Sequence, residues 1–188
     1  LLGARYRARE GQARMAELVR DVLQRCRHGV IEAGTGIGKS FAYLIPVLWA
    51  GTSAVVSTSN KGLMNQLWEK DIPMLKEIAP RPFEAALLKG RSNYVCAMKL
   101  DALRKQPGLP HLDETLRTLR KALNRVPSGD MGRMHLPPKL VARLTVGSRE
   151  CRGTSCDQYK ACYYERAKRT AVKADLVVTN HAMLCTNT

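Results

Sequence analysis

One glycine-rich segment restricts the folds open to this 188-residue chain more than any other feature. Residues 33–40 match the phosphate-binding pattern G-x-x-x-x-G-K-[ST], except that alanine stands first. Glycines let backbone amides turn toward phosphate oxygens, Lys39 supplies charge for the β- and γ-phosphates, and Ser40 is placed to ligate Mg²⁺. We expect Lys39 and Ser40 to be catalytic. We expect a nucleotide to be bound by Ala33, Gly34, Thr35, Gly36, Ile37, Gly38, Lys39 and Ser40.

Strands and helices alternate on both sides of this loop. Apolar residues at three- and four-residue steps predict a helix over 10–26, and further helices are expected over 40–49 and 61–70, the last ended by Pro73. Short apolar runs predict strands at 29–33, 53–57, 85–88 and 175–179. The alternation predicts an α/β fold with a parallel sheet covered on both faces.

Positive charge is concentrated in the middle of the chain. The whole chain carries 31 Lys and Arg against 16 Asp and Glu, and residues 91–173 alone hold 18 basic and 7 acidic residues. Positive charge of this size favours nucleic acid as a partner first and an anionic membrane second. The basic residues could also form a solvated surface that binds no partner. The longest apolar run, 41–50, is too short to span a bilayer.

One part of a nucleotide-hydrolysing site is not visible. Such a site needs an acidic residue at the end of another strand to hold Mg²⁺ and position water. Asp175 begins its expected strand instead of ending it. We therefore expect this chain alone to bind ATP better than it hydrolyses it. A small P-loop kinase is a weaker candidate, because it would need an acceptor-binding lid.

Four of the six cysteines lie in the basic middle: Cys96, Cys151, Cys156 and Cys162. Four thiolates would suit Zn²⁺ or an iron–sulfur cluster, and the spacing does not decide between these and unrelated buried thiols. Cys26 and Cys185 are expected to be small buried hydrophobes. His181 follows an expected strand and is interpreted as structural.

Several motifs together resemble the DinG family of iron–sulfur superfamily-two DNA helicases, which are relatives of XPD. Residues 5–15 are similar to the Q motif, and 33–40 to motif I, in which alanine at the first position is normal. Residues 55–73 are similar to motif Ia, although Asn60 stands where the family has threonine. Residues 89–96 and the three later cysteines resemble the cluster ligands, and 177–183 resembles the segment before the DEAH box.

The resemblance implies roles for particular residues. Arg9 and Gln12 would bind the adenine nucleotide, and a [4Fe–4S] cluster would be held by Cys96, Cys151, Cys156 and Cys162. DNA contacts are expected at Thr58, Lys61, Arg91 and Arg152. The implied cofactors are ATP, Mg²⁺ and the cluster, which would pin the ends of the 91–173 insertion.

The resemblance also implies a domain plan and an activity. Residues 1–90 would form part of an incomplete RecA-like motor domain, 91–173 the iron–sulfur insertion, and 174–188 the return strand, ending before the DEAH box. The parent protein would be an ATP-dependent 5′-to-3′ DNA helicase in repair or replication, a monomer in the bacterial cytosol acting on single-stranded or forked DNA. The alternative is a zinc-containing nucleic-acid-binding module with a regulatory or idle P-loop.

Overall fold

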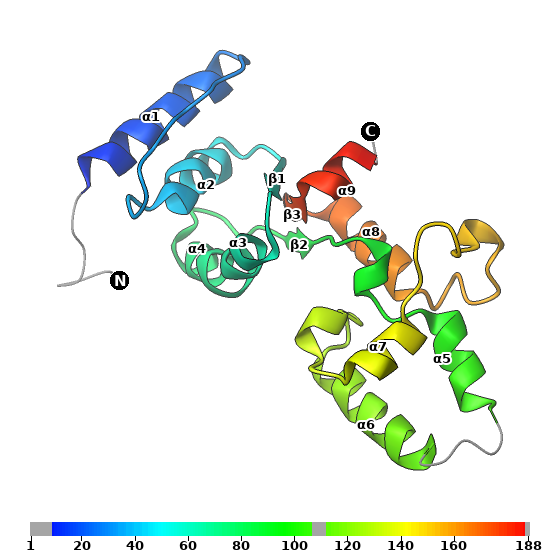
Figure 1. The fold of residues 1–188 in the computed structure, drawn as a ribbon. Coiled ribbons are helices and arrows are strands. Elements are labelled where there is room, and N and C mark those ends of the chain that lie inside the picture. The colour runs from blue at the N-terminus through cyan, green and yellow to red at the C-terminus, as the bar shows by residue number, and fades with distance from the viewer. Residues whose placement is uncertain (1–8, 107–111, 187–188) are drawn as a thin grey trace. The chain divides into compact units, whose positions relative to one another are not determined.

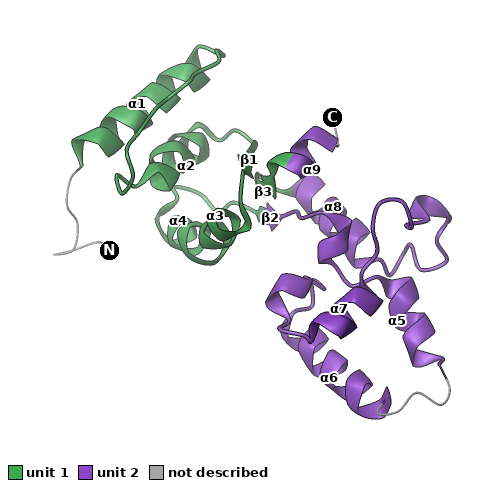
Figure 2. Ribbon diagram, viewed as in Figure 1, with its two compact units in different colours: residues 1–85, 174–181 green, residues 86–173, 182–188 purple. Residues whose placement is uncertain are grey.

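The computed structural model describes residues 9–106 and 112–186, and it divides into two compact units. Unit 1 comprises residues 1–85 and 174–181, and unit 2 comprises residues 86–173 and 182–188 (Figures 1 and 2). Residues 5–8 of the Q motif lie outside the described residues. No helix of the described part is long and apolar enough to cross a bilayer.

A small sheet carries the parallel pairing that the alternation predicts. Strand β3 (Leu176–Asn180) lies between β1 (Ala54–Thr58) and β2 (Ala85–Leu87). β1 and β3 are parallel, with Ala54 opposite Leu176 and Thr58 opposite Asn180. Leu176 and Val178 of the middle strand are almost fully buried. The α/β class is confirmed, and three of the four expected strands form within one residue of their expected bounds.

The fourth expected strand, at 29–33, is wrong. Residues 27–34 form no regular structure, and the Val30 side chain is fully exposed. A strand needs a neighbouring strand to satisfy its backbone groups, and among the described residues no strand pairs with this segment. Its apolar run therefore remains an extended loop that leads into the P-loop.

The helices of unit 1 follow the expected ranges, except at Pro73. They are α1 (Glu10–Gln24), α2 (Lys39–Ala50), α3 (Lys61–Gln66) and α4 (Ile72–Ile78), with a π-helical turn, η2 (Leu67–Asp71), between the last two. The expected end at Pro73 is wrong, since Pro73 lies in the first turn of α4. Proline is tolerated there because the first turn of a helix needs no N–H donor, and the wider π turn continues the helical path.

Unit 2 is built from helices around its own apolar core. It contains α5 (Ala97–Arg104), α6 (Leu112–Arg125), α7 (Pro138–Leu144) and α8 (Tyr163–Lys173), and most of α9 (His181–Thr186). Short 3₁₀ turns lie at η3 (Arg91–Asn93), η4 (Met131–Arg133) and η5 (Gly153–Ser155). The buried cluster consists of Val95, Leu100, Leu103, Leu119, Ala122, Val126, Met131, Met134 and Leu144. The cysteine-bearing loop 145–162 contributes none of these.

A buried ion pair fixes the start of unit 2. The Lys89 ammonium lies 2.7 Å from the Asp130 carboxylate, and both side chains are about 95% buried (6% and 4% exposed). Asp130 also accepts a hydrogen bond from the Gly132 amide at 3.0 Å, so its charge has two partners. The pair joins residues 41 positions apart in the chain.

The two cysteines outside the group of four are exposed, so the expectation that they are buried is wrong. Cys26 lies in the turn after α1 with a left-handed backbone (φ +49°), which places it outside the packed face of that helix. Cys185 lies on α9, none of whose described residues is buried.

Candidate functional site

The P-loop of unit 1 has the left-handed backbone that its glycines permit. Gly36 and Gly38 have φ values of +79° and +86°, and Gly38 is the N-cap of α2. Glycine is needed at Gly38 for its backbone conformation, and a β-carbon there, 2.6 Å from the Gln12 amide nitrogen, would push the Gln12 side chain away from the loop. The Lys39 ammonium folds back onto the loop and donates to the carbonyls of Ala33 (2.9 Å) and Gly34 (3.0 Å).

Two side chains at the start of α1 contact this loop. Gln12 donates to the Gly38 carbonyl at 3.1 Å, and the Arg9 guanidinium donates to the Gly36 carbonyl. Helix α1 packs against α2, which carries Lys39 and Ser40. The structure thus gathers Arg9, Gln12 and residues 33–40 in one place, although 26 positions separate Gln12 from Gly38.

A tyrosine that sequence reasoning missed lies one helical turn after Ser40. Tyr43 is partly buried on the helix that begins with Lys39 and Ser40. The pKa of Tyr43 is raised, first by burial and further by the charge of Asp71, which together outweigh the opposing effect of the Ser40 hydroxyl. The i, i+3 spacing from Ser40 was the available signal, because such residues lie on one helix face.

Two of the residues expected to contact DNA lie near the carboxyl end of β1. Thr58 is 3% exposed and its hydroxyl donates to the Asn60 carbonyl at 3.0 Å, so this side chain shapes the turn instead of presenting itself to solvent. Asn60 caps α3 by accepting from the Leu63 amide at 2.8 Å, and Lys61 is exposed. At the same edge Ser57 of β1 and His181, the first residue of α9, form a side-chain hydrogen bond of 2.7 Å.

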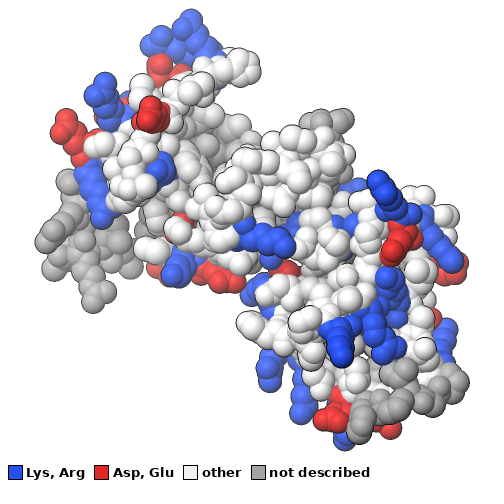
Figure 3. Space-filling view, viewed as in Figure 1, with Lys and Arg blue, Asp and Glu red and all other residues white. Residues whose placement is uncertain are grey.

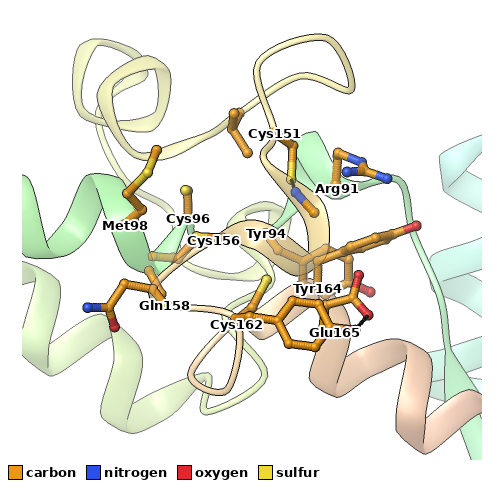
Figure 4. A pocket seen from close by; sticks show the side chains of 15 residues that line it. Arg91, Tyr94, Cys96, Met98, Cys151, Cys156, Gln158, Cys162, Tyr164 and Glu165 are labelled. Atoms are coloured by element: carbon orange, nitrogen blue, oxygen red, sulfur yellow. Dashed lines mark hydrogen bonds between the residues drawn. The ribbon is translucent and has the colours of Figure 1, made fainter.

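In unit 2, the four cysteines of the basic middle line one pocket (Figure 4). Cys96 is the N-cap of α5, and its amide is held by the Leu144 carbonyl at 2.7 Å. Cys151 follows the Gly147 turn, Cys156 follows η5, and Cys162 directly precedes α8. All four are free thiols. The pocket brings Cys96 together with three cysteines that follow it by 55 or more positions in the chain.

The pocket also contains groups that stabilise negative charge on sulfur. The Gly153 amide donates to the Cys151 sulfur at 3.5 Å, and Arg91 lines the same pocket. Burial alone would lower the pKa of Arg91, but the neighbouring Cys151, Tyr164 and Glu165 raise it overall. The Arg91 guanidinium also lies 4.9 Å from the centre of the Tyr164 ring. Thiolate ligands are stabilised by such donors and cations.

The sulfur atoms surround the pocket without meeting at one point. Among the residues that the structure describes, no group of three or more His, Cys, Asp or Glu side chains is arranged to hold a metal ion.

Tyr94, which also lines the pocket, is buried, and this burial raises its pKa to about 12. Its hydroxyl accepts a hydrogen bond from the Lys89 amide at 3.1 Å and donates one to the Leu87 carbonyl at 3.3 Å. These two bonds fix the position of the Tyr94 side chain in the pocket wall.

Basic side chains gather on the face of unit 2 seen in Figure 3. Arg91 and Lys168 both approach the Tyr164 ring, while Arg166 lies 4.7 Å from the centre of the Tyr163 ring. Arg152, the fourth residue expected to contact DNA, is exposed in the cysteine loop. Aromatic rings thus hold several of the cations on and beside α8 in place.

Comparison with known proteins gives relatives over almost the whole chain. It is 38% identical over 181 residues to the ATP-dependent DNA helicase YoaA of Haemophilus influenzae, covering 94% of this chain and 28% of that protein. It is 37% identical to the ATP-dependent helicase DinG of Mycobacterium tuberculosis (94% and 30%). It is 34% identical to the 3′-5′ exonuclease DinG of Bacillus subtilis (97% and 20%). No family model matches the chain. The chain spans less than a third of the length of these relatives.

Proposed function

Since the sequence of this chain matches a segment of the DinG-family helicases, we propose that it is the ATP-binding and iron–sulfur part of an ATP-dependent DNA helicase. The parent enzyme would be a 5′-to-3′ DNA helicase that binds single-stranded or forked DNA, as a monomer in the bacterial cytosol, during repair or replication. Residues 1–90 and 174–188 would belong to a RecA-like motor domain, and 91–173 to its iron–sulfur insertion.

The observation that carries the nucleotide-binding part is the contact between α1 and the P-loop. Gln12 and Arg9 both donate hydrogen bonds to carbonyls of the P-loop. The residue that would recognise adenine, Gln12, therefore belongs to the same site as the loop that would bind the phosphates. When ATP binds, Lys39 would exchange its two carbonyl partners for phosphate oxygens. Ser40 would place its hydroxyl on Mg²⁺, which neutralises phosphate charge.

Replacing Lys39 with alanine should weaken ATP binding roughly 10- to 100-fold, because a hydrogen bond to a charged group contributes about 1.5–3 kcal/mol. Equilibrium titration of the chain with a fluorescent ATP analogue and Mg²⁺ would measure the loss. Lys70→Ala is the matched control, since Lys70 is exposed on the π turn of the same unit. Equal affinity in the two variants would contradict the assignment of Lys39.

The four-cysteine pocket supports a [4Fe–4S] cluster held by Cys96, Cys151, Cys156 and Cys162. A cluster binds each thiolate to a different iron, so the four sulfurs need to surround a space instead of converging on one atom. Four thiols around one pocket, with Arg91 and the Gly153 amide beside Cys151, fit this donor set. The cluster would stabilise loop 145–162, which contributes no residue to the buried cluster of unit 2 and only Val146 as a buried apolar side chain.

The second candidate is a zinc-containing nucleic-acid-binding module whose P-loop is regulatory or idle. A single Zn²⁺ with four thiolates at about 2.3 Å draws the sulfurs to within roughly 3.8 Å of one another. Iron and sulfide analysis of anaerobically purified protein separates the two candidates. An absorbance band at about 400 nm, typical of iron–thiolate charge transfer, would favour the helicase part.

Binding of single-stranded DNA should weaken steeply as salt rises, because the basic residues of 91–173 release counterions from phosphates. In fluorescence anisotropy titrations, Arg152→Gln should lower the slope of log affinity against log salt by about 0.7, the value for one phosphate contact. Arg25→Gln is the control, because Arg25 already pairs with Asp21 at 2.6 Å in unit 1. A salt-independent affinity would contradict phosphate binding by this chain.

A further inference from the structure

A second pocket of unit 2 shares no residue with the pocket that the cysteines line. Its volume is about 360 Å³, which is within the usual range of small-ligand sites. Part of the lining comes from residues spaced by three and four positions, which lie on one face of α6: Thr118, Lys121, Ala122 and Arg125. The rest comes from the segment that follows α6, including Arg133 and His135.

Every ionisable residue in the lining of this pocket is basic, and all of them are exposed: Lys121, Arg125, Arg133 and His135. Within residues 9–106 and 112–186, none of the four forms an ion pair. Other cations of the same unit are paired, since Lys99 meets Glu150 and Lys105 meets Asp101. Positive charges gathered around one cavity repel one another and attract an anion, which would relieve that repulsion.

The buried part of the lining is apolar and belongs to the core of unit 2. Ala122, Val126 and Met134 line the pocket, each is less than 10% exposed, and all three are members of the buried cluster. The cations therefore stand on elements that the core holds in place. An apolar surface with a few charged groups around it is typical of sites that bind small ligands.

The turn that carries Arg133 already has a fixed shape. Asp130 caps η4, because its carboxylate accepts from the Gly132 amide at 3.0 Å while it pairs with the buried Lys89. The Arg133 amide donates to the Asp130 carbonyl at 3.1 Å. His135 has a φ of +51°, a conformation that is uncommon outside glycine, persists only where its surroundings hold it, and recurs where proteins clamp a ligand. A ligand would therefore need to order little of this backbone.

We propose that this pocket binds a phosphate group, carried either by the backbone of single-stranded DNA or by a free polyphosphate. Each of the two arginines offers a fork of N–H donors that matches phosphate oxygens, and Lys121 adds a point charge. The site is separate from the P-loop, and none of the residues expected to contact DNA lines it. The inference rests on the proposed binding of DNA only where DNA supplies the phosphate.

Acetylation of Lys121 by an amine-reactive reagent gives a readout at the site itself, because this lysine is exposed and a bound phosphate would shield it. The full chain is treated with the reagent alone, with tripolyphosphate, or with a short oligothymidylate that has no terminal phosphate. Mass spectrometry compares Lys121 with Lys139, an exposed lysine of α7 that does not line the pocket. At a probe concentration about ten times its Kd, acetylation of Lys121 should slow roughly 10-fold by mass action, and that of Lys139 should not change.

Two variants test the arginines. Arg125→Gln and Arg133→Gln should each raise the probe concentration needed for shielding roughly 5- to 10-fold, between the values for an exposed ion pair and for a charged hydrogen bond. Glutamine keeps much of the aliphatic stem, so the pocket should keep its shape. Arg120→Gln is the matched control, since Arg120 is exposed on the same helix and does not line the pocket.

Shielding by tripolyphosphate would support a site for free phosphates, and shielding by the oligonucleotide alone would support a site for the DNA backbone. If the chain binds the oligonucleotide but neither probe shields Lys121, the phosphate site is wrong and the proposed function stands. If tripolyphosphate shields Lys121 but the chain binds no oligonucleotide, the site stands and DNA binding is contradicted. Equal slowing at Lys139, or an equal effect of Arg120→Gln, would indicate general charge screening and overturn the site.

Discussion

Replacing Lys89 with methionine should destabilise unit 2 by about 3–5 kcal/mol, because the Asp130 charge would remain buried without its partner. Methionine keeps most of the side-chain volume, so loss of packing contributes little. Asp130 would retain its bond from the Gly132 amide, which alone does not neutralise a charge that is 4% exposed.

The two units can be followed separately in the same sample. Both tryptophans, Trp49 and Trp68, belong to unit 1, so their fluorescence reports that unit alone. Hydrogen exchange measured by mass spectrometry on peptides of α6 and α7 reports unit 2. The expected result is faster exchange in these helices with little change in the tryptophan transition.

A second lysine provides the control for the ion pair. Lys105→Met breaks the pair with Asp101 at 2.8 Å on α5, but the Lys105 side chain is 75% exposed, so the loss should stay below about 1 kcal/mol. The double variant Lys89→Met, Asp130→Asn removes the unpaired charge and should regain part of the stability. A loss of less than about 1 kcal/mol in Lys89→Met would contradict the importance of this pair.

Replacing Cys156 with serine should remove most of the bound iron and expose loop 145–162 to proteases, while the helical core of unit 2 stays folded. The residues of the buried cluster lie on or next to α5, α6, η4 and α7, and none lies in this loop. We therefore expect the cluster to be a local support of the loop. An insertion that depended wholly on the cluster would unfold throughout.

Trypsin and iron analysis together measure this outcome. Arg149, Arg152 and Lys160 are cleavage sites inside the loop, and Arg117 and Arg120 are sites on α6. Cleavage should accelerate at the first group only. Cys26→Ser is the control, since Cys26 is exposed and belongs to unit 1. Iron retained at the wild-type level, or rapid cleavage on α6 as well, would contradict the expectation.

The order of residues within short segments was enough to locate the P-loop, the helices on either side of it and the three strands of the sheet. The glycine spacing of 33–40, the apolar steps of α1 and α2 and the runs that form β1, β2 and β3 are all read within a short window of sequence. The family resemblance added Gln12 and Arg9, and the structure brings both to the loop. The loop, helices and strands were predictable because their signals depend on residues near one another in the chain, whereas the contacts of Gln12 and Arg9 with the loop join residues 26 and 27 positions apart.

Other properties were decided by partners far away in the sequence. The segment 29–33 has the apolar run of a strand but no paired neighbour, and Thr58 turns inward although its motif suggests contact with DNA. The Lys89–Asp130 pair and the pocket that Arg91 shares with Cys151 have no signal in local spacing. Burial and hydrogen-bond satisfaction arise only when separate segments pack, so they are properties of the tertiary structure.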